Sequence, residues 1–234
     1  MRVSTQPAPV RHQTVINLRQ AILEGRFLPG DRLYEQRLCD LMGVSRTSIR
    51  EALRQLESEG LVTMLPNRGP VVTEITLQDA EDIYQVRELL EGLAAELFAR
   101  RADAQAIEAL DAAVGNLEEC IRQRDDRTLL KKKNEFYEIL FRGSRNLVLY
   151  TLLNSLLARV SVLRGISLSQ PHRPRQSLSE IKKIIRAIKA RDPEAAYLAS
   201  KEHVRKAAAV AIESLSENLG RYNMSREKGE DYAE

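Results

Sequence analysis

The sequence predicts a mainly α-helical fold in two parts, a small N-terminal part that carries a β-hairpin and a larger all-helical part. Apolar residues recur at the three- and four-residue spacing of helices along most of the chain. Only residues 61–73 show the apolar runs and turn residues of a β-hairpin. After residue 76 the helical stretches are joined by short connections, which favours an antiparallel all-α bundle of about six helices.

The N-terminal part is expected to begin with a mobile arm at residues 1–10, which contain two prolines and little apolar content. A first helix follows over residues 11–25, with its apolar side chains on one face. A short helix is predicted over residues 35–42, closed by Gly43. The next helix covers residues 45–59 and opens on a serine suited to cap it.

A β-hairpin is predicted next, with strands over residues 61–65 and 70–73 and a tip at residues 66–69. Two short helices joined by a tight turn and followed by a hairpin are typical of a winged helix-turn-helix. We place this domain at residues 11–75.

The bundle is expected to follow a linker at residues 74–77, where Thr76 and Asp79 resemble a capping box. We place the bundle domain at residues 76–220, a loop or kink at residues 170–175, and a flexible tail at residues 221–234. Its six helices are predicted over residues 79–101, 103–124, 126–142, 147–169, 177–191 and 193–220.

Neither a membrane nor export is expected. The longest apolar stretch, residues 147–163, is interrupted by polar residues and falls short of the ~20 residues that cross a bilayer, so we interpret it as a core helix. Residues 1–13 have no apolar run of a secretory signal. Cys39 and Cys120 stand far apart and fit no zinc spacing or disulfide framework. We therefore expect a cytoplasmic protein.

The charge is arranged locally rather than abundant. Lys+Arg 36 against Asp+Glu 33 gives a net charge of +3, which excludes a polybasic scavenger of nucleic acid. Residues 1–75 hold ten basic side chains, all of them arginine, and eight acidic ones, and the first lysine is Lys131. The arginine fork suits phosphates and guanine edges, so any contact with DNA depends on where these arginines lie.

No catalytic motif is present, so an enzyme is not predicted. The sequence lacks a nucleophile elbow, a zinc-protease helix and a phosphate-binding glycine loop. The three histidines, His12, His172 and His203, fall in separate predicted segments and form no cluster.

The start of the predicted recognition helix holds the residues suited to contact DNA. Ser45, Arg46, Thr47, Ser48 and Arg50 combine hydroxyls and a helix N-terminus, which can bind phosphate, with two arginines that can pair with guanine. Arg46 and Arg50 are four residues apart and share a helix face. The alternative is a solvated helix start with a serine cap. The flanking short helix and hairpin favour the DNA-binding interpretation.

The hairpin tip carries Asn67, Arg68 and Gly69. An arginine at this position can enter a neighbouring minor groove. An ordinary turn with an exposed arginine explains the same residues.

These residues resemble the GntR family of bacterial transcription regulators. The resemblance runs through Gly43 to Arg46, Ile49 to Leu53, Leu56 to Leu61 and Asn67 to Gly69, and covers most of residues 11–75. The helical remainder resembles the FadR-type subfamily with its FCD ligand-binding domain, and six helices rather than seven resemble the VanR-type group.

The resemblance implies a homodimer, a double-stranded operator with two half-sites, and an effector that is a small organic acid or related anionic metabolite. DNA contact then falls on the recognition-helix residues and the hairpin tip. Gln36 stands where the family often has arginine, and Arg37 is the neighbouring candidate for that phosphate contact.

Many FCD domains bind a divalent metal through one aspartate and three histidines, but this chain departs from that pattern. The matching positions hold Lys133, Tyr137, Ile181 and His203. One imidazole beside a lysine, a tyrosine and an isoleucine is too few ligands, so we predict no metal and no other cofactor. A shift of one residue in this placement would bring in a neighbouring asparagine or glutamate.

We hypothesise that Lys133, Tyr137 and His203 bind the carboxylate or phosphate of the effector directly, with Arg87 and Arg164 as further candidates. The alternatives are structural. Residues 131–133 are three consecutive lysines, which favours a solvated face. Arg87 has Glu91 at i+4 as a partner for a salt bridge.

The sequence thus predicts a ligand-responsive transcription regulator, with repression the commoner mode in the family. Two alternatives remain. One is an adaptor that uses the winged helix to dock protein, which would show no salt-dependent retention on DNA. The other is a regulator without metal and without a small-molecule effector.

Overall fold

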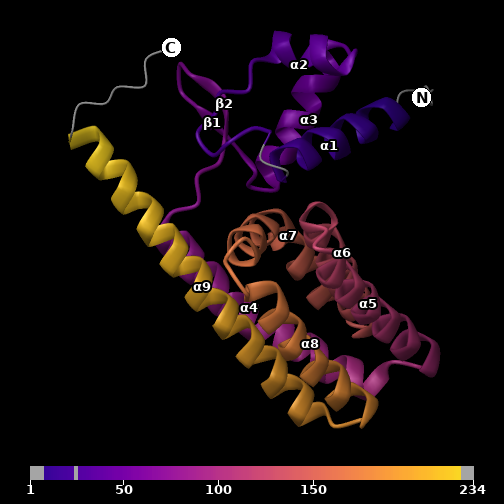
Figure 1. The fold of residues 1–234 in the computed structure, drawn as a ribbon. Helices are drawn as coiled ribbons and strands as arrows, with labels where there is room; N and C mark the ends of the chain where they lie inside the picture. Colours follow the sequence, from indigo (N-terminus) through magenta and orange to yellow (C-terminus); the bar gives the residue numbers. More distant parts are fainter. Residues whose placement is uncertain (1–7, 24–25, 228–234) are drawn as a thin grey trace, which may run out of the picture. The chain divides into compact units, whose positions relative to one another are not determined.

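The computed structural model describes residues 8–23 and 26–227. The chain divides into two compact units, the first ending at Ile75 but also including Leu157–Arg159, and the second formed by the rest of the chain from Thr76. The first unit contains α1 (Ala8–Leu23), α2 (Glu35–Met42), α3 (Arg46–Ser58), β1 (Val62–Leu65) and β2 (Gly69–Val72). The second contains α4 (Leu77–Arg101), α5 (Ala104–Gln123), α6 (Asp126–Gly143), α7 (Leu147–Leu168), α8 (Arg173–Lys189) and α9 (Pro193–Glu227). Figure 1 shows both units.

The first unit is the predicted arrangement of three helices and a hairpin. α1 packs on α3, and α2 packs on the other end of α3. Leu18, Leu38, Ile49 and Leu56 are at most 1% exposed and form its core. The hairpin is antiparallel, with Val62 opposite Val72. Arg32, which lies before α2, pairs with Val71 through an isolated antiparallel β-bridge.

The first helix begins earlier than predicted. α1 starts at Ala8, so residues 8–10 of the expected mobile arm are helical. Pro9 lies in the first turn, where a helix needs no backbone N–H from it. Residues 1–7 lie outside the described residues.

In the second unit, α4 and α9 run antiparallel along their length (Figure 1). Glu88 of α4 pairs with Lys201 and Arg205 of α9, and Gly92, one turn further along α4, lies beside Tyr197. A Cβ at Gly92 would come within 2.9 Å of the Tyr197 ring, so the glycine permits this close approach. The long pair supports α5, α6 and α8, which pack on α4, on α9 or on one another.

Local capping signals set several helix starts. Thr76 and Asp79 form the predicted capping box at the start of α4. Asp103 caps α5, and Asn146 caps α7 by accepting from the Leu149 backbone N–H at 3.1 Å. Each cap satisfies a backbone donor that the helix leaves free, and is worth about 0.5–2 kcal/mol.

Two helix bounds in the bundle differ from the prediction. α8 begins at Arg173 rather than residue 177, because Pro174 lies in its first turn instead of breaking it. α9 continues to Glu227, so the predicted flexible tail is helical over residues 221–227. Residues 228–234 lie outside the described residues.

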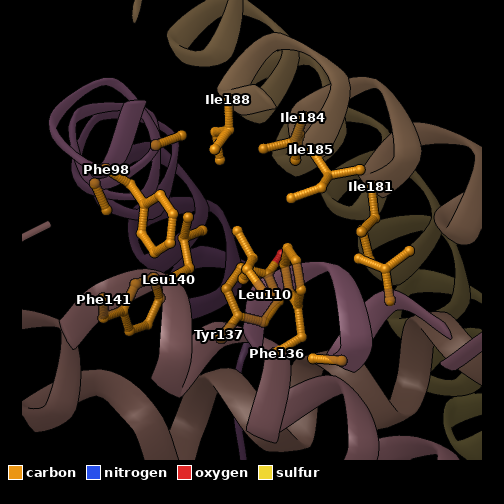
Figure 2. Packing of buried hydrophobic residues seen from close by; sticks show 14 of the residues in the cluster. Phe98, Leu110, Phe136, Tyr137, Leu140, Phe141, Ile181, Ile184, Ile185 and Ile188 are labelled. Atoms are coloured by element: carbon orange, nitrogen blue, oxygen red, sulfur yellow. The ribbon is translucent and has the colours of Figure 1, made fainter. Parts of the chain in front are cut away.

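The bundle core takes buried side chains from all six helices of the unit, and Figure 2 shows part of it. Phe136, Tyr137, Leu140 and Phe141 come from α6 and face a row of isoleucines on α8. The isoleucines are Ile181, Ile184, Ile185 and Ile188, each at most 4% exposed. Burial of each large side chain contributes about 1.5–3 kcal/mol. These side chains stabilise the bundle together with α4 and α5, on which both α6 and α8 pack.

α7 is the one helix among residues 8–23 and 26–227 that is long and apolar enough to cross a membrane, a test that core helices of soluble proteins also pass. We expected a core helix here, and one face of α7 is buried, with Leu153 and Leu163 at 3% and 0% exposure. Its first turns expose Leu147, Val148 and Leu152.

Gly143 and Gly115 give a matched pair of stability predictions. A Cβ at Gly143 would lie 2.1 Å from the buried Phe98 ring, so Gly143→Ala should destabilise the bundle by about 1–3 kcal/mol. A Cβ at Gly115, in the middle of α5, meets nothing within 4 Å, and Gly115→Ala should stabilise it by about 0.5–1 kcal/mol. Guanidinium unfolding followed by circular dichroism measures both. Equal effects would contradict the packing described.

Candidate functional site

The first candidate surface is the N-terminal turn of α3. α2 ends at Gly43, which has φ 65°, and the chain turns into α3 over three residues. The Ser45 hydroxyl accepts from the Ser48 backbone N–H at 3.2 Å and caps the helix. Arg46, Thr47 and Arg50 are exposed on the first turn and a half. This places guanidinium and hydroxyl donors where α3 can enter a groove.

Both arginines contact side chains of α2, which the sequence analysis missed. Arg50 Nε donates to both carboxylate oxygens of Glu35 at 2.9 Å, and Arg46 Nε donates to Gln36 Oε1 at 3.2 Å. Glu35 thus binds the Arg50 guanidinium through Nε. Arg37, the neighbouring candidate for phosphate, is exposed.

The hairpin tip presents the other predicted DNA-contacting residues. Asn67 has φ 62° and Gly69 has φ 81°, so both adopt the left-handed conformation that a tight tip requires. The Arg68 backbone N–H donates to the Leu65 carbonyl at 3.2 Å, and the Arg68 side chain is exposed.

The second candidate site is a polar cluster inside the bundle, and it brings together all five predicted effector residues. They come from four helices: Arg87 from α4, Lys133 and Tyr137 from α6, Arg164 from α7, and His203 from α9. Each is at most 2% exposed. Polar and charged groups at this depth are costly unless they are paired, so their convergence marks a site.

Glu91 connects the arginines of two helices. Arg87 Nε donates to Glu91 Oε1 at 2.8 Å, which is the i+4 salt bridge considered from the sequence. Arg164 Nη2 donates to the same oxygen at 3.3 Å, and its Nη1 donates to Asn134 Oδ1 at 2.9 Å. The Arg164 guanidinium also stacks over Tyr137, 3.6 Å from the ring centre. α4, α6 and α7 thus meet at one carboxylate.

Lys133 is buried, and the expectation of a solvated lysine face is wrong for it. Lys131 is exposed and Lys132 pairs with Glu135, but Lys133 lies one turn from Phe136 and Tyr137 on the inward face of α6. Its Nζ donates to Ser177 Oγ at 2.8 Å. The helical rotation of 100° per residue separates the three lysines onto different faces.

A second buried ion pair, which the sequence analysis missed, closes the cluster. Arg173 Nη1 and Nη2 donate to the two oxygens of Glu180 at 2.9 Å, and Glu180 Oε2 lies 2.5 Å from His203 Nδ1. Once α8 is known to start at Arg173, the seven-residue spacing to Glu180 places both on one helix face. The available signal for that start is Pro174, because proline is common in the first turn of a helix.

The ionisation of the cluster follows from burial. Burial lowers the pKa of His203 to about 4, despite the carboxylate of Glu180 beside it. Burial also lowers the pKa of Lys133 well below its ordinary value, and the charges of Arg164 and Arg173 lower it further. For Glu180, hydrogen bonds from His203 and Arg173 outweigh burial and lower the pKa to about 2.

The residues at the family's metal positions do not fit a divalent metal. Lys133, Tyr137, Ile181 and His203 are all buried, but a lysine and an isoleucine are not ligands for zinc or nickel. His203 already uses Nδ1 toward Glu180. Across residues 8–23 and 26–227, no three His, Cys, Asp or Glu side chains gather as a metal site.

The stability of the bundle should rise with pH between about 4 and 6.5. Unfolded His203 binds a proton over this range while buried His203 does not, so each pH unit contributes at most about 1.4 kcal/mol. Unfolding curves across this range should show a shallower slope for His203→Gln, and an unchanged slope for His12→Gln on exposed α1. A slope that His203→Gln leaves unaltered would contradict a neutral buried histidine.

Two family models match the chain, one for each unit. Residues 11–72 match the bacterial regulatory proteins of the gntR family, and residues 82–206 match the FCD domain.

Relatives agree along most of the chain. The HTH-type transcriptional regulator YdhC of Bacillus subtilis is 32% identical over 200 residues, covering 85% of this chain and 88% of that protein. A D-xylose utilization operon transcriptional repressor of Paenarthrobacter nicotinovorans is 27% identical over 78% of this chain and 80% of its own length.

A solved GntR transcriptional regulator from Rhodococcus sp. RHA1 has a TM-score of 0.75 and 25% identity, with 87% of this chain and 97% of that chain covered. These similarities agree with the fold and with the two units described above. The chain belongs to the GntR family of bacterial DNA-binding transcription regulators, which are not enzymes, and its bundle is an FCD domain.

Proposed function

We propose that this regulator is a cytoplasmic homodimeric repressor whose affinity for operator DNA changes when a small organic acid binds in the bundle. The observation that carries the proposal is the buried cluster around Glu91, because it gathers cations from four helices within a domain of a ligand-binding class. The name of the Paenarthrobacter relative, a repressor of a sugar utilization operon, supports repression.

In the proposed complex, the start of α3 enters the major groove of each half-site. Arg46 and Arg50 read base edges, while Ser45, Thr47, Ser48 and the α3 N-terminus bind phosphate. The remaining contacts fall on the α2 side chain Arg37 and on the hairpin tip residues Asn67, Arg68 and Gly69. Glu35 must share or release Arg50 when DNA binds, because both use the same guanidinium.

In the bundle, Lys133 takes the role that a metal ion has in other FCD domains, so effector binding needs no metal. Lys133 supplies a positive charge, Arg87 and Arg164 supply donors, and Tyr137 and His203 line the site. The Tyr137 hydroxyl and His203 Nε2 are buried without a hydrogen-bond partner. Ligand binding is then transmitted through residues 74–77 as a shift in the population of DNA-binding conformations.

Ligand binding should be visible as a thermal shift of the full chain. In a screen of carboxylic acids and phosphate esters, at least one should raise Tm with concentration, and a chelator should leave the shift unchanged. If no compound raises Tm, the regulator acts without a small-molecule effector. If the chelator abolishes the shift, binding requires a metal.

Lys133→Met should separate stability from ligand binding. Removal of a buried, poorly paired charge is expected to raise Tm of the ligand-free protein, while the ligand-dependent shift disappears. Lys132→Met, on the exposed side of the same turn, should keep the shift. If Lys133→Met kept the full ligand-dependent shift in Tm, Lys133 would not bind the effector.

Arg46→Ala should weaken operator binding by about 1–3 kcal/mol and relax specificity at one base pair, if Arg46 reads a guanine. An operator selected from random duplexes and fluorescence anisotropy at two salt concentrations measure this. Uniform weakening on all DNA would make Arg46 a phosphate contact. Arg122→Ala, on the exposed face of α5, is the matched control and should leave binding unchanged.

A further inference from the structure

The charges buried in the bundle do not balance. Among the described residues, four buried side chains are cationic, and they lie on four helices: Arg87, Lys133, Arg164 and Arg173. Only two buried side chains are carboxylates, Glu91 and Glu180. The cations thus exceed the anions by two charges when all six groups are ionised.

The two carboxylates are already shared. Glu91 accepts from Arg87 and from Arg164 through the same oxygen, so one carboxylate serves two guanidinium groups. Glu180 receives both terminal nitrogens of Arg173 and also contacts His203. Lys133 hydrogen-bonds neither of these two carboxylates, and its Nζ donates instead to the hydroxyl of Ser177. The surplus therefore lies at Lys133 and at the Arg87–Arg164 pair.

Donors of the three buried arginines lack partners. Arg87 Nη1, Arg164 Nε and Arg173 Nε are buried and make no hydrogen bond. A buried N–H without an acceptor costs free energy comparable to a lost hydrogen bond, and more when the group is charged. Glu91 Oε2 is also buried without a hydrogen-bond partner, so the protein's own acceptors do not pair with these donors in this arrangement.

We propose that the effector is a dianion, with anionic oxygens bound both on the Lys133–Ser177 side of the cluster and on the Arg87–Arg164 side. Such a ligand neutralises both surplus charges and supplies oxygens to the unpartnered donors. Dicarboxylates and phosphate monoesters share this chemistry. The inference rests on the proposed function, since it names the class of ligand that the same site takes.

The direct test is calorimetric titration of the full chain at pH 7.5 with matched ligand pairs. Malonate, succinate and glutarate are compared with their monoamides, which have almost the same shape and one charge less. Methyl phosphate is compared with dimethyl phosphate, so that the two arms distinguish a carboxylate from a phosphate ligand. The dianion of at least one pair should bind about tenfold or more tightly than its monoanion, because the monoanion leaves a buried cation unpaired.

Lys133→Met removes one buried cation, so the expected preference for the dianion over the monoanion should disappear. This variant should lose the preference for the dianion and bind the monoamide as well or better, while Lys132→Met keeps the preference of the unmodified chain. The wild-type titrations decide the matter even if the variant fails to fold. If the unmodified chain bound the monoanions equally or more tightly, the inference of a dianionic effector would be contradicted. The proposal that the effector is an organic acid would still stand. Binding of no anion would overturn both.

Discussion

Glu91 and Glu180 share the task of compensating four cations that the bundle buries out of reach of solvent. Glu91 of α4 binds Arg87 of the same helix and Arg164 of α7. Separating the two helices would therefore expose a charge to solvent or leave it buried and unpaired. Glu180 ties the start of α8 to α9 in the same way, through Arg173 and His203. A buried ion pair adds little net stability, but breaking one costs several kcal/mol, about 3–5. The paired charges therefore tie α4 to α7 and α8 to α9.

The DNA-facing unit uses charge differently. Its arginines are exposed, and α2 holds them through Glu35 and Gln36 rather than burying them. Solvent screens these contacts, so they orient the side chains at little energetic cost to their release. DNA phosphates and base edges can replace them. The bundle buries its cations, whereas the DNA-facing unit exposes Arg46 and Arg50 to solvent. Buried cations suit a selective site for a small anion, and exposed ones suit contact with a large polyanion.

Much of the fold could be predicted because the signals for it are local. The bounds of α2, the Ser45 cap of α3 and the Thr76–Asp79 capping box depend only on residues within one or two turns. The predicted starts of α1 and α8 were too late, because prolines near both starts were interpreted as part of an arm or a loop. In both helices a proline lies in the first turn, where it starts a helix as readily as it interrupts one.

The site was only partly predictable, because burial is decided by tertiary packing. Resemblance identified Lys133, Tyr137 and His203 as candidates, and their position in apolar helices identified Arg87 and Arg164. The structure adds that all five converge. The sequence could not show that Lys133 is buried, since three consecutive lysines are typical of a surface and only the packing of α6 selects one of them. The pairing of Arg50 with Glu35 joins residues fifteen apart across two helices, and no periodicity within one helix reports it.

If charge in the bundle controls DNA binding, the operator affinity of the full chain must respond to a bound dianion. Fluorescence anisotropy would measure Kd for a selected operator duplex with and without a saturating dianion, with saturation established by calorimetry. The dianion should change Kd several-fold in the unmodified chain and leave it unchanged in Lys133→Met. An unchanged Kd in the unmodified chain at full ligand occupancy would contradict this control of DNA binding.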